Sequence, residues 1–462
     1  MWLALGIIVL IASFFAQPAV GLTAASIRSL GVTFATVLWW ITEALPIPVT
    51  GLLVFPLLHT MGVVPFKLLF AQTFGDPFVP FMIGCLALSV AFTKSGLGKR
   101  ITYIILSYSG IKVNRILDAF FWIPFAISAF ITDLAVVALM YPIALSLAKA
   151  AKAEVGKSNF GLCLMFAITF GGVIGGLCTP SGVPSNIITI SFLEKNAHLT
   201  MGFLEWTIIA TPIAIVLGVC SQWLTKKMYK PEIEVLPFGP EVIAKELSNM
   251  GPWTQQEKTT LVVFLTAVSL WLTGDFTKLP IAVVSLFIVA LLTIPGFSAV
   301  KGWRDIESEL EWGSLMLMVG GFALGVATFE SGLAKWLAQH AIQPLAVLPT
   351  YLQPFAITLL VAIDSLGFSS FTAASAVNVP LVIAYAQQNG YPVASLAMAA
   401  GLASSTHFIL VTESLCFVLT YASGYYTFKD LFKVGCILTV ISAIVIALGV
   451  LVAGMPMGTP IR

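Results

Sequence analysis

Long apolar segments recur along nearly the whole chain and are separated by short stretches rich in charged, glycine or proline residues. The segments are continuously apolar and do not alternate residue by residue, which is the pattern of membrane helices and not of a transmembrane barrel. The one long polar stretch runs from Lys226 to Lys258. The pattern therefore predicts an all-α polytopic membrane protein with a polar linker near its middle.

The segment from Arg115 to Lys157 has basic residues at both ends and two apolar limbs, 116–131 and 134–147, which meet at Thr132 and Asp133. Each limb would form a helix of roughly 22 Å, shorter than the hydrocarbon core of about 30 Å. The positive-inside rule places both ends in the cytoplasm. We therefore expect a re-entrant hairpin with a polar tip. Two ordinary spans joined by a polar turn are the alternative.

A second irregular segment follows a span that begins near Phe160. Glycines crowd the stretch 171–176, and prolines occur at positions 180 and 184. Because both residue types disfavour helix interiors, we expect a helix broken at this stretch in mid-membrane. Free backbone amides there would suit an anion and free carbonyls a cation. A plain loop outside the membrane is the alternative, which the apolar flanks disfavour.

The second half of the chain repeats the first. Residues 82–99 and 318–335 are identical at ten of eighteen positions, at a constant offset of 236. The hairpin recurs at an offset of 238, so that Thr132 corresponds to Ser370 and Pro142 to Pro380. The chain is therefore an internal duplication.

The charges indicate that the two halves have opposite orientations. Residues 94–157 contain eight Lys or Arg, whereas none occurs from Trp336 to Phe428. The positive-inside rule then predicts that the second hairpin, about 351–387, enters from the outside. Inverted repeats with broken helices are typical of secondary transporters. We expect a first repeat at 1–225, a cytoplasmic linker at 226–258 and a second repeat at 259–462.

Composition supports this class and excludes others. The chain is 58% hydrophobic and only 10% charged, with a mean hydropathy of +0.99. Its net charge of +2 does not suggest nucleic-acid binding. The six cysteines and four histidines occur singly, without metal-ligand or catalytic spacing, so we expect neither an enzyme nor a cofactor. Proteins of this kind lie in the lipid bilayer, here expected to be the inner membrane of a bacterium.

Three features resemble the divalent anion–sodium symporter family, which carries dicarboxylates, citrate and sulfate. They are the segment Trp40–Thr50 (Trp-Ile-Thr-Glu-Ala-Leu-Pro-Ile-Pro-Val-Thr), the doubled Ser-Gly-Leu segments, and Pro184-Ser185-Asn186. The order of elements agrees over essentially the whole chain. The resemblance implies a homodimer, eleven spans with two re-entrant hairpins, and a transport domain that moves like an elevator.

The family carries Ser-Asn-Thr at each hairpin tip and Thr-Pro-Pro-Asn in each broken helix. This sequence departs from both patterns, because the tips read Thr132-Asp133-Leu134 and Ser370-Phe371-Thr372, and the second break reads Ile409 to Ser414 without proline or asparagine. The resemblance implies the following substrate-binding residues: Thr132, Asp133, Pro184, Ser185, Asn186, Ser370, Thr372, Thr412 and Ser414.

The departures bring acidic residues into the site. Asp133 replaces an amide, and Glu413 adds a carboxylate to the second break. Because intramembrane acids are costly and commonly mark ion paths, we expect Asp133, Asn186 and Glu413 to bind the coupling ion, sodium or a proton. The alternative is that each acid is merely hydrogen-bonded, or paired with His407 or a lysine. The expected function is secondary transport of a small anion, and a cation/proton antiporter is the competing hypothesis.

Overall fold

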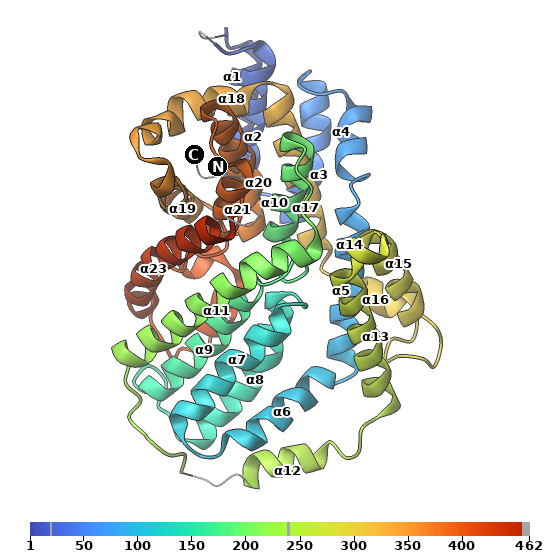
Figure 1. The fold of residues 1–462 in the computed structure, drawn as a ribbon, viewed down its shortest axis with the longest axis vertical. Coiled ribbons are helices and arrows are strands. Elements are labelled where there is room, and N and C mark those ends of the chain that lie inside the picture. The colour runs from blue at the N-terminus through green and yellow to red at the C-terminus, as the bar shows by residue number, and fades with distance from the viewer. Residues whose placement is uncertain (19–20, 238–240, 455–462) are drawn as a thin grey trace.

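A computed structural model describes residues 1–18, 21–237 and 241–454 (Figure 1). This part of the chain is mainly helical and contains no strand beyond one isolated bridge between Lys112 and Val235. Six of its helices are long and apolar enough to cross a membrane, or seven if the bent pair formed by α4 and α5 counts as one span. The all-α membrane fold is thus confirmed, whereas eleven spans stay a prediction.

The first half of the chain and the linker contain twelve helices within the described residues. They are α1 (Trp2–Phe15), α2 (Ala24–Thr42), α3 (Ile47–Thr60), α4 (Phe66–Thr73), α5 (Phe78–Lys94), α6 (Leu97–Ser109), α7 (Val113–Ser128), α8 (Asp133–Ala150), α9 (Asn159–Gly175), α10 (Pro184–Ala197), α11 (Phe203–Met228) and α12 (Glu241–Asn249).

The second half adds eleven α-helices in the described range. They are α13 (Gln255–Leu272), α14 (Gly274–Thr277), α15 (Ile281–Leu292), α16 (Trp303–Glu309), α17 (Trp312–Glu330), α18 (Leu333–Leu337), α19 (Gln353–Asp364), α20 (Phe371–Asn389), α21 (Val393–Ala403), α22 (Leu415–Tyr421) and α23 (Phe428–Gly454). Short 3₁₀ or π turns occur at Ala338–Ile342, Gln343–Val347, Thr350–Leu352, Ser365–Gly367 and Val411–Glu413.

Both expected hairpins are pairs of helices joined by a short turn. In the first, α7 and α8 meet through residues 129–132; in the second, α19 and α20 meet through residues 365–370. The two pairs lie in opposite halves of the molecule, with α7 and α8 in the lower part of Figure 1 and α19 and α20 in the upper part. The two tips therefore approach the middle from opposite ends.

The break in the first broken helix lies further along the chain than the glycines at 171–176 predict. Helix α9 continues through Gly171 to Gly175 and stops only before the turn 176–183. A Cβ atom on Gly171 would lie 2.4 Å from the carbonyl oxygen of Phe121, and one on Gly175 would lie 2.2 Å from that of Phe125. These glycines do not break the helix. They allow α9 to pack closely against α7, and the helix persists because exposed backbone groups are costly inside a membrane protein.

The second broken helix is irregular over residues 404–414, between α21 and α22. Two of its backbone amides are satisfied locally, since the carboxylate of Glu413 accepts hydrogen bonds from the amides of Ile409 (3.1 Å) and Leu410 (2.9 Å). The two breaks touch directly, because the hydroxyl oxygens of Ser185 and Ser405 lie 2.5 Å apart and both residues are buried. The two breaks therefore contact each other in the core.

Helices of the two sequence halves pack against each other at repeat-related glycines. A Cβ on Gly84 of α5 would lie 2.4 Å from the Cβ of Ser285 in α15, and one on Gly320 of α17 would lie 2.6 Å from the Cα of Gly51 in α3. The offset of 236 relates Gly84 to Gly320. Each half thus contributes a helix to a close contact with the other half.

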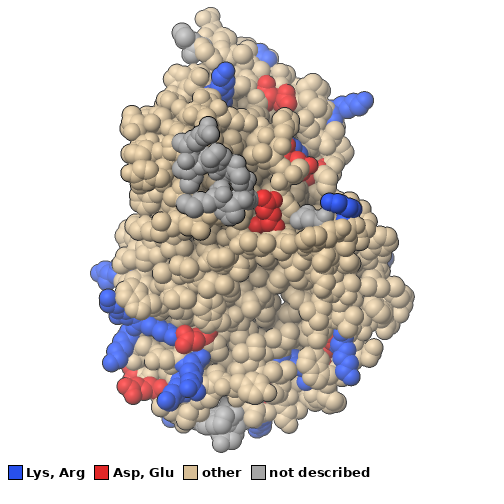
Figure 2. Space-filling view, viewed as in Figure 1, with Lys and Arg blue, Asp and Glu red and all other residues tan. Residues whose placement is uncertain are grey.

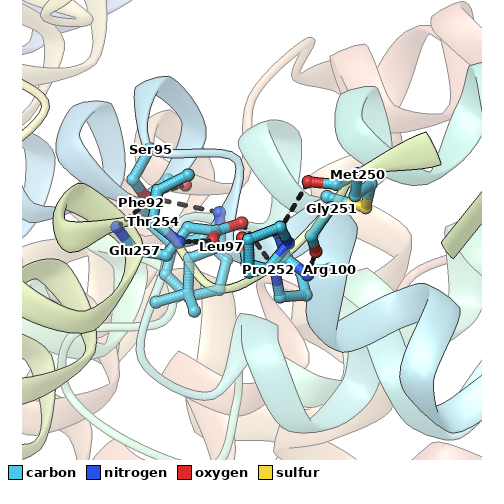
Figure 3. Close-up of polar contacts among 9 residues, drawn as sticks. All are labelled: Phe92, Ser95, Leu97, Arg100, Met250, Gly251, Pro252, Thr254 and Glu257. Carbon is cyan, nitrogen blue, oxygen red and sulfur yellow. Dashed lines mark hydrogen bonds and ion pairs between the residues drawn. The ribbon is translucent and has the colours of Figure 1, made fainter. Parts of the chain in front are cut away.

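Arg100 of α6 forms hydrogen bonds with the end of the linker and the start of α13 (Figure 3). Its guanidinium bonds the carboxylate of Glu257 at 2.7 Å and the carbonyl oxygens of Gly251, Met250 and Pro252 at 2.9, 3.1 and 3.2 Å. Both side chains of the ion pair are at most 4% exposed. Helix α11 extends to Met228 and α13 starts at Gln255, so the segment between these helices is shorter than the expected linker 226–258.

The surface is mostly uncharged over the middle of the molecule (Figure 2). Lys and Arg are most frequent at the lower end of that view, where Figure 1 shows the first hairpin and α6. Few charged side chains on the surface and a basic end are typical of a lipid-embedded protein.

Candidate substrate cavity

One cavity of about 580 Å³ brings both hairpin tips and both helix breaks together. Thr132 and Asp133 come from the first tip, Ser370 and Thr372 from the second, and Pro184 from the first break. Thr412, Glu413 and Ser414 from the second break also line it. Eight of the ten residues named from the sequence therefore face a single space.

Ser185 and Asn186 do not line this cavity. Asn186 is fully buried, and its amide nitrogen donates to the carbonyl oxygens of Gly176 at 2.9 Å and Thr179 at 2.8 Å. Ser185 instead contacts Ser405, as described above. Asn186 thus braces the turn 176–183 that precedes Pro184, whereas Ser185 joins the first break to the second. Their expected role in binding substrate or the coupling ion stays a prediction.

At the first tip, Thr132 precedes α8 without capping it. Thr132 is 4% exposed, and its hydroxyl has no hydrogen-bond partner among the described residues. Asp133 begins the helix and accepts a hydrogen bond from the amide of Leu134 at 2.8 Å. A carboxylate in the first turn of a helix is stabilised by the helix dipole. The acid at this tip is therefore partly compensated by its own backbone.

The second tip lies against the last turn of α2. Ser369 donates a hydrogen bond to the carbonyl oxygen of Trp40 at 3.1 Å. Phe371, which stands where the family has an amide, packs against His407 with ring centroids 5.2 Å apart. His407 is thus behind the cavity wall, and it does not pair with Glu413.

Two acids in the cavity wall were not expected from the sequence as site residues. Glu43 belongs to the Trp40–Thr50 segment, which carries the family resemblance, and Glu311 lies outside every motif named above; both line the cavity. Glu43 ends α2 with a left-handed backbone (φ 48°), and Glu311 directly precedes α17. An acid placed immediately before a long apolar helix was the available signal for Glu311.

The cavity is therefore strongly acidic. Four carboxylates line it, from Glu43, Asp133, Glu311 and Glu413, and its lining includes no Lys, Arg or His. Within the described residues, none of the four lies within ion-pair distance of a basic side chain. The expected alternative, pairing with His407 or a lysine, is thus not seen. The same part of the chain contains no group of three His, Cys, Asp or Glu residues arranged to hold a metal.

A second cavity of about 580 Å³ lies between α5, α6 and α8. Ser89 and Thr93 of α5, Lys99 of α6 and Ala138 of α8 are among its lining residues. Glu311 lines this cavity as well as the first. Because Lys99 belongs to the basic end of the molecule, the second cavity extends from the hairpin tip toward the expected cytoplasmic side.

Comparisons with known proteins agree with this architecture. A family model described as the sodium:sulfate symporter transmembrane region matches residues 1–459. The sodium-dependent dicarboxylate transporter SdcS of Staphylococcus saprophyticus is 30% identical over 445 residues, which is 91% of this chain and 84% of the relative. SdcS of Staphylococcus aureus is 28% identical over 447 residues, with the same coverage.

A solved structure shares the fold at low sequence identity. The Alcanivorax borkumensis YdaH transporter, described as having an unusual topology, is 15% identical with a TM-score of 0.57, and the likeness covers 86% of this chain and 89% of that one. The match of the family model to nearly the whole chain is decisive for its classification. The chain is an integral membrane protein that belongs to the sodium:sulfate symporter family.

Proposed function

We propose that the protein is a secondary active transporter of a small anion, a di- or tricarboxylate or a sulfate-like ion, and not an enzyme. The observation that carries this proposal is the single cavity lined by both hairpin tips and both helix breaks. Helix N-termini at such breaks attract anions, whereas free carbonyls attract cations. The relatives named as sodium-dependent dicarboxylate transporters support the substrate class and sodium as coupling ion.

Alternating access is supported by a difference between the two hairpins. Ala138 and Pro142 of α8 are exposed and line the second cavity. Their repeat counterparts in α20, Ala376 and Pro380, are buried. Equivalent positions of the two hairpins are thus exposed in the first repeat and buried in the second. We infer that this conformation is open to the cytoplasm and closed to the outside. In the opposite state the first hairpin would be buried and the second exposed.

The moving part is proposed to be an elevator-type body that contains both hairpins and both breaks. Its parts are joined internally, as the contact between Ser185 and Ser405 illustrates. The helices α3, α5, α15 and α17, joined at Gly84 and Gly320, would form the static part. A homodimer in a bacterial plasma membrane, with the linker on the cytoplasmic side, completes the proposal.

We further propose that Asp133 and Glu413 couple transport to a cation, sodium or a proton. The test is anion uptake into proteoliposomes at several pH values, with and without sodium. If Asp133 carries the coupling proton, Asp133→Asn makes uptake independent of pH. Asp118→Asn is the matched control, because Asp118 pairs with Lys226 away from the cavity. An unchanged pH profile in Asp133→Asn would contradict the hypothesis.

A cation/proton antiporter is the second candidate, favoured by the four carboxylates in a cavity without a basic side chain. Two measurements separate the candidates. Uptake of a labelled anion supports the symporter, whereas proton movement driven by a cation gradient, with no anion uptake, supports the antiporter.

A further inference from the structure

A buried cluster of polar contacts joins α10 to the turn between α4 and α5. The carboxylate of Asp76 accepts hydrogen bonds from the amide of Phe78 at 2.8 Å and from the hydroxyl of Ser191 at 2.7 Å. The same carboxylate pairs with the ammonium group of Lys195. The side chain of Asp76 is 2% exposed and that of Lys195 is 23% exposed. The acid therefore has three partners, and two of them come from α10.

Lys195 also contacts α4 and α17. Its ammonium group donates a hydrogen bond to the carbonyl oxygen of Gln72 at 2.6 Å and lies 4.5 Å from the ring centroid of Phe322. About one turn earlier in α10, Phe192 packs so closely on α17 that a Cβ on Gly325 would lie 2.0 Å from its ring. The end of α10 is therefore joined to α4, to α17 and to the turn before α5.

The cluster crosses the boundary between the proposed moving body and the proposed static part. Helix α10 directly follows the first break, and it packs on α21, because a Cβ on Gly401 would lie 2.1 Å from the hydroxyl oxygen of Thr189. Asp76 lies just before α5 of the static part. Among the ion pairs of residues 1–18, 21–237 and 241–454, only that of Lys195 and Asp76 joins an element of one part to an element of the other.

The cluster lies on the side of the molecule that is expected to face outward. Helices α4 and α10 are in the upper part of Figure 1 with α19 and α20, whereas α7 and α8 are in the lower part, at the basic end. The positive-inside rule disfavours a lysine on the outer side. Burial of its charge is costly unless the charge is paired. Lys195 therefore requires the acid of the other part as long as the two parts are in contact here.

We propose that Lys195 and Asp76 form a latch that keeps the outer side closed. The pair is formed in this conformation and separates when α10 moves relative to α5 and α17 toward the opposite state. Both charges are then hydrated, so that neither is left buried without a partner. This inference rests on the alternating access of the proposed function, and it names the residues that set the balance between the two states.

The latch makes the loss of one charge different from the loss of both. Lys195→Met or Asp76→Asn leaves the other charge buried without its partner in this conformation, whereas the same charge is hydrated in the opposite state. Each single variant therefore favours the opposite state. The combined variant contains neither charge, and replacement of a buried ion pair by neutral groups costs little. A pair that only stabilises the fold would lower the melting temperature of the single variants without a shift between the two states.

The experiment measures thiol labelling by a small water-soluble maleimide in purified protein, where the reagent reaches both sides. The labelled positions are Ala138→Cys of the first hairpin and Ala376→Cys of the second, in a background without native cysteines. Labelling is compared in Lys195→Met, in Asp76→Asn and in their combination. Ser191→Ala is a milder variant that removes one hydrogen bond to the acid and leaves no charge unpaired.

Lys226→Met is the matched control for Lys195→Met. The side chain of Lys226 is 22% exposed, close to the value for Lys195, and it also pairs with an acid, Asp118 of α7. That pair does not involve the static part, so its loss should leave the labelling of both hairpins unchanged. Melting temperatures above the labelling temperature show that each variant is folded.

The latch predicts a specific pattern of rates. Each single charge variant raises labelling at Ala376→Cys about tenfold or more relative to Ala138→Cys, and a tenfold shift corresponds to about 1.4 kcal/mol. The combined variant returns this ratio toward the wild-type value. Ser191→Ala raises it by about threefold, in keeping with the loss of one hydrogen bond.

Other results would overturn the latch or the proposed function separately. An unchanged ratio in both single variants excludes the latch, whatever their melting temperatures, and leaves alternating access in place. A raised ratio that the combined variant does not reverse assigns the effect to lost packing and also excludes the latch. Equal labelling of both cysteines without any further substitution excludes alternating access and the latch together. A reversible shift in a protein that transports no anion retains the latch and excludes the anion-transport function.

Discussion

Gly321 of α17 and Ala376 of α20 are so close that a Cβ atom on Gly321 would lie 2.6 Å from the Cβ of Ala376. Real Cβ atoms essentially never approach this closely, so this contact requires glycine. The repeat counterpart of Ala376 is Ala138, which is exposed in the second cavity. The contact between Gly321 and Ala376 therefore buries the second hairpin at the position where the first hairpin is exposed.

The two alanines are expected to differ in accessibility. In a background without native cysteines, Ala138→Cys should react with a small water-soluble thiol reagent, whereas Ala376→Cys should not. Adding Gly321→Val should open the second hairpin and raise the rate at Ala376→Cys by about tenfold or more, because a two-state equilibrium shifts with the strain placed on one state. Gly367→Val is the control, since nothing lies near that glycine. Equal rates at both cysteines in the absence of Gly321→Val would refute the asymmetry.

Replacement of Glu43 is expected to separate stability from function. Glu43 has a left-handed backbone (φ 48°), which is unfavourable for a residue with a side chain. Glu43→Gly should therefore raise the free energy of unfolding by about 1 kcal/mol and reduce ligand binding. Glu43→Gln keeps the strained backbone and loses the charge, so it should reduce binding without the gain in stability. Thermal unfolding with and without ligand checks both; a less stable Glu43→Gly would contradict the interpretation.

The buried ion pair of the linker is expected to be important for stability. Arg100→Ala leaves Glu257 buried without its cation and leaves three linker carbonyls without a donor. It should lower the free energy of unfolding by about 3 kcal/mol. Lys157→Ala is the comparison, because the pair of Lys157 and Glu154 is largely exposed and should contribute little. Similar stabilities for the two variants would show that the linker contact is not important.

Asn186 is expected to stabilise the first break. Its amide nitrogen donates to two carbonyl oxygens of the turn at 2.8–2.9 Å inside the core. Asn186→Ala should lower the free energy of unfolding by about 2 kcal/mol, because buried carbonyls lose their donor. Asn159→Ala removes an exposed amide that bonds Lys230 and should have a smaller effect. A stable Asn186→Ala protein that no longer binds ligand would instead favour the ligand role expected from the family.

The sequence by itself determined the helical membrane class, the duplication and the position of both hairpin tips. These follow from local quantities: the length of apolar runs, the residues that interrupt them and the recurrence at an offset of 236 to 238. The family resemblance then placed both tips and both breaks at one site, and eight of the ten named residues do line the central cavity.

Only the tertiary structure decided the remaining features. Glycines 171 and 175 suggested a helix break, yet they continue α9, because a neighbouring helix occupies the space where their side chains would be. Glu43 and Glu311 are 268 positions apart, so no local pattern could bring them into one cavity with Asp133 and Glu413. Likewise, Ala138 and Ala376 are the same residue type in the same motif. Their different burial arises from the packing of whole helices, which a sequence repeat does not encode.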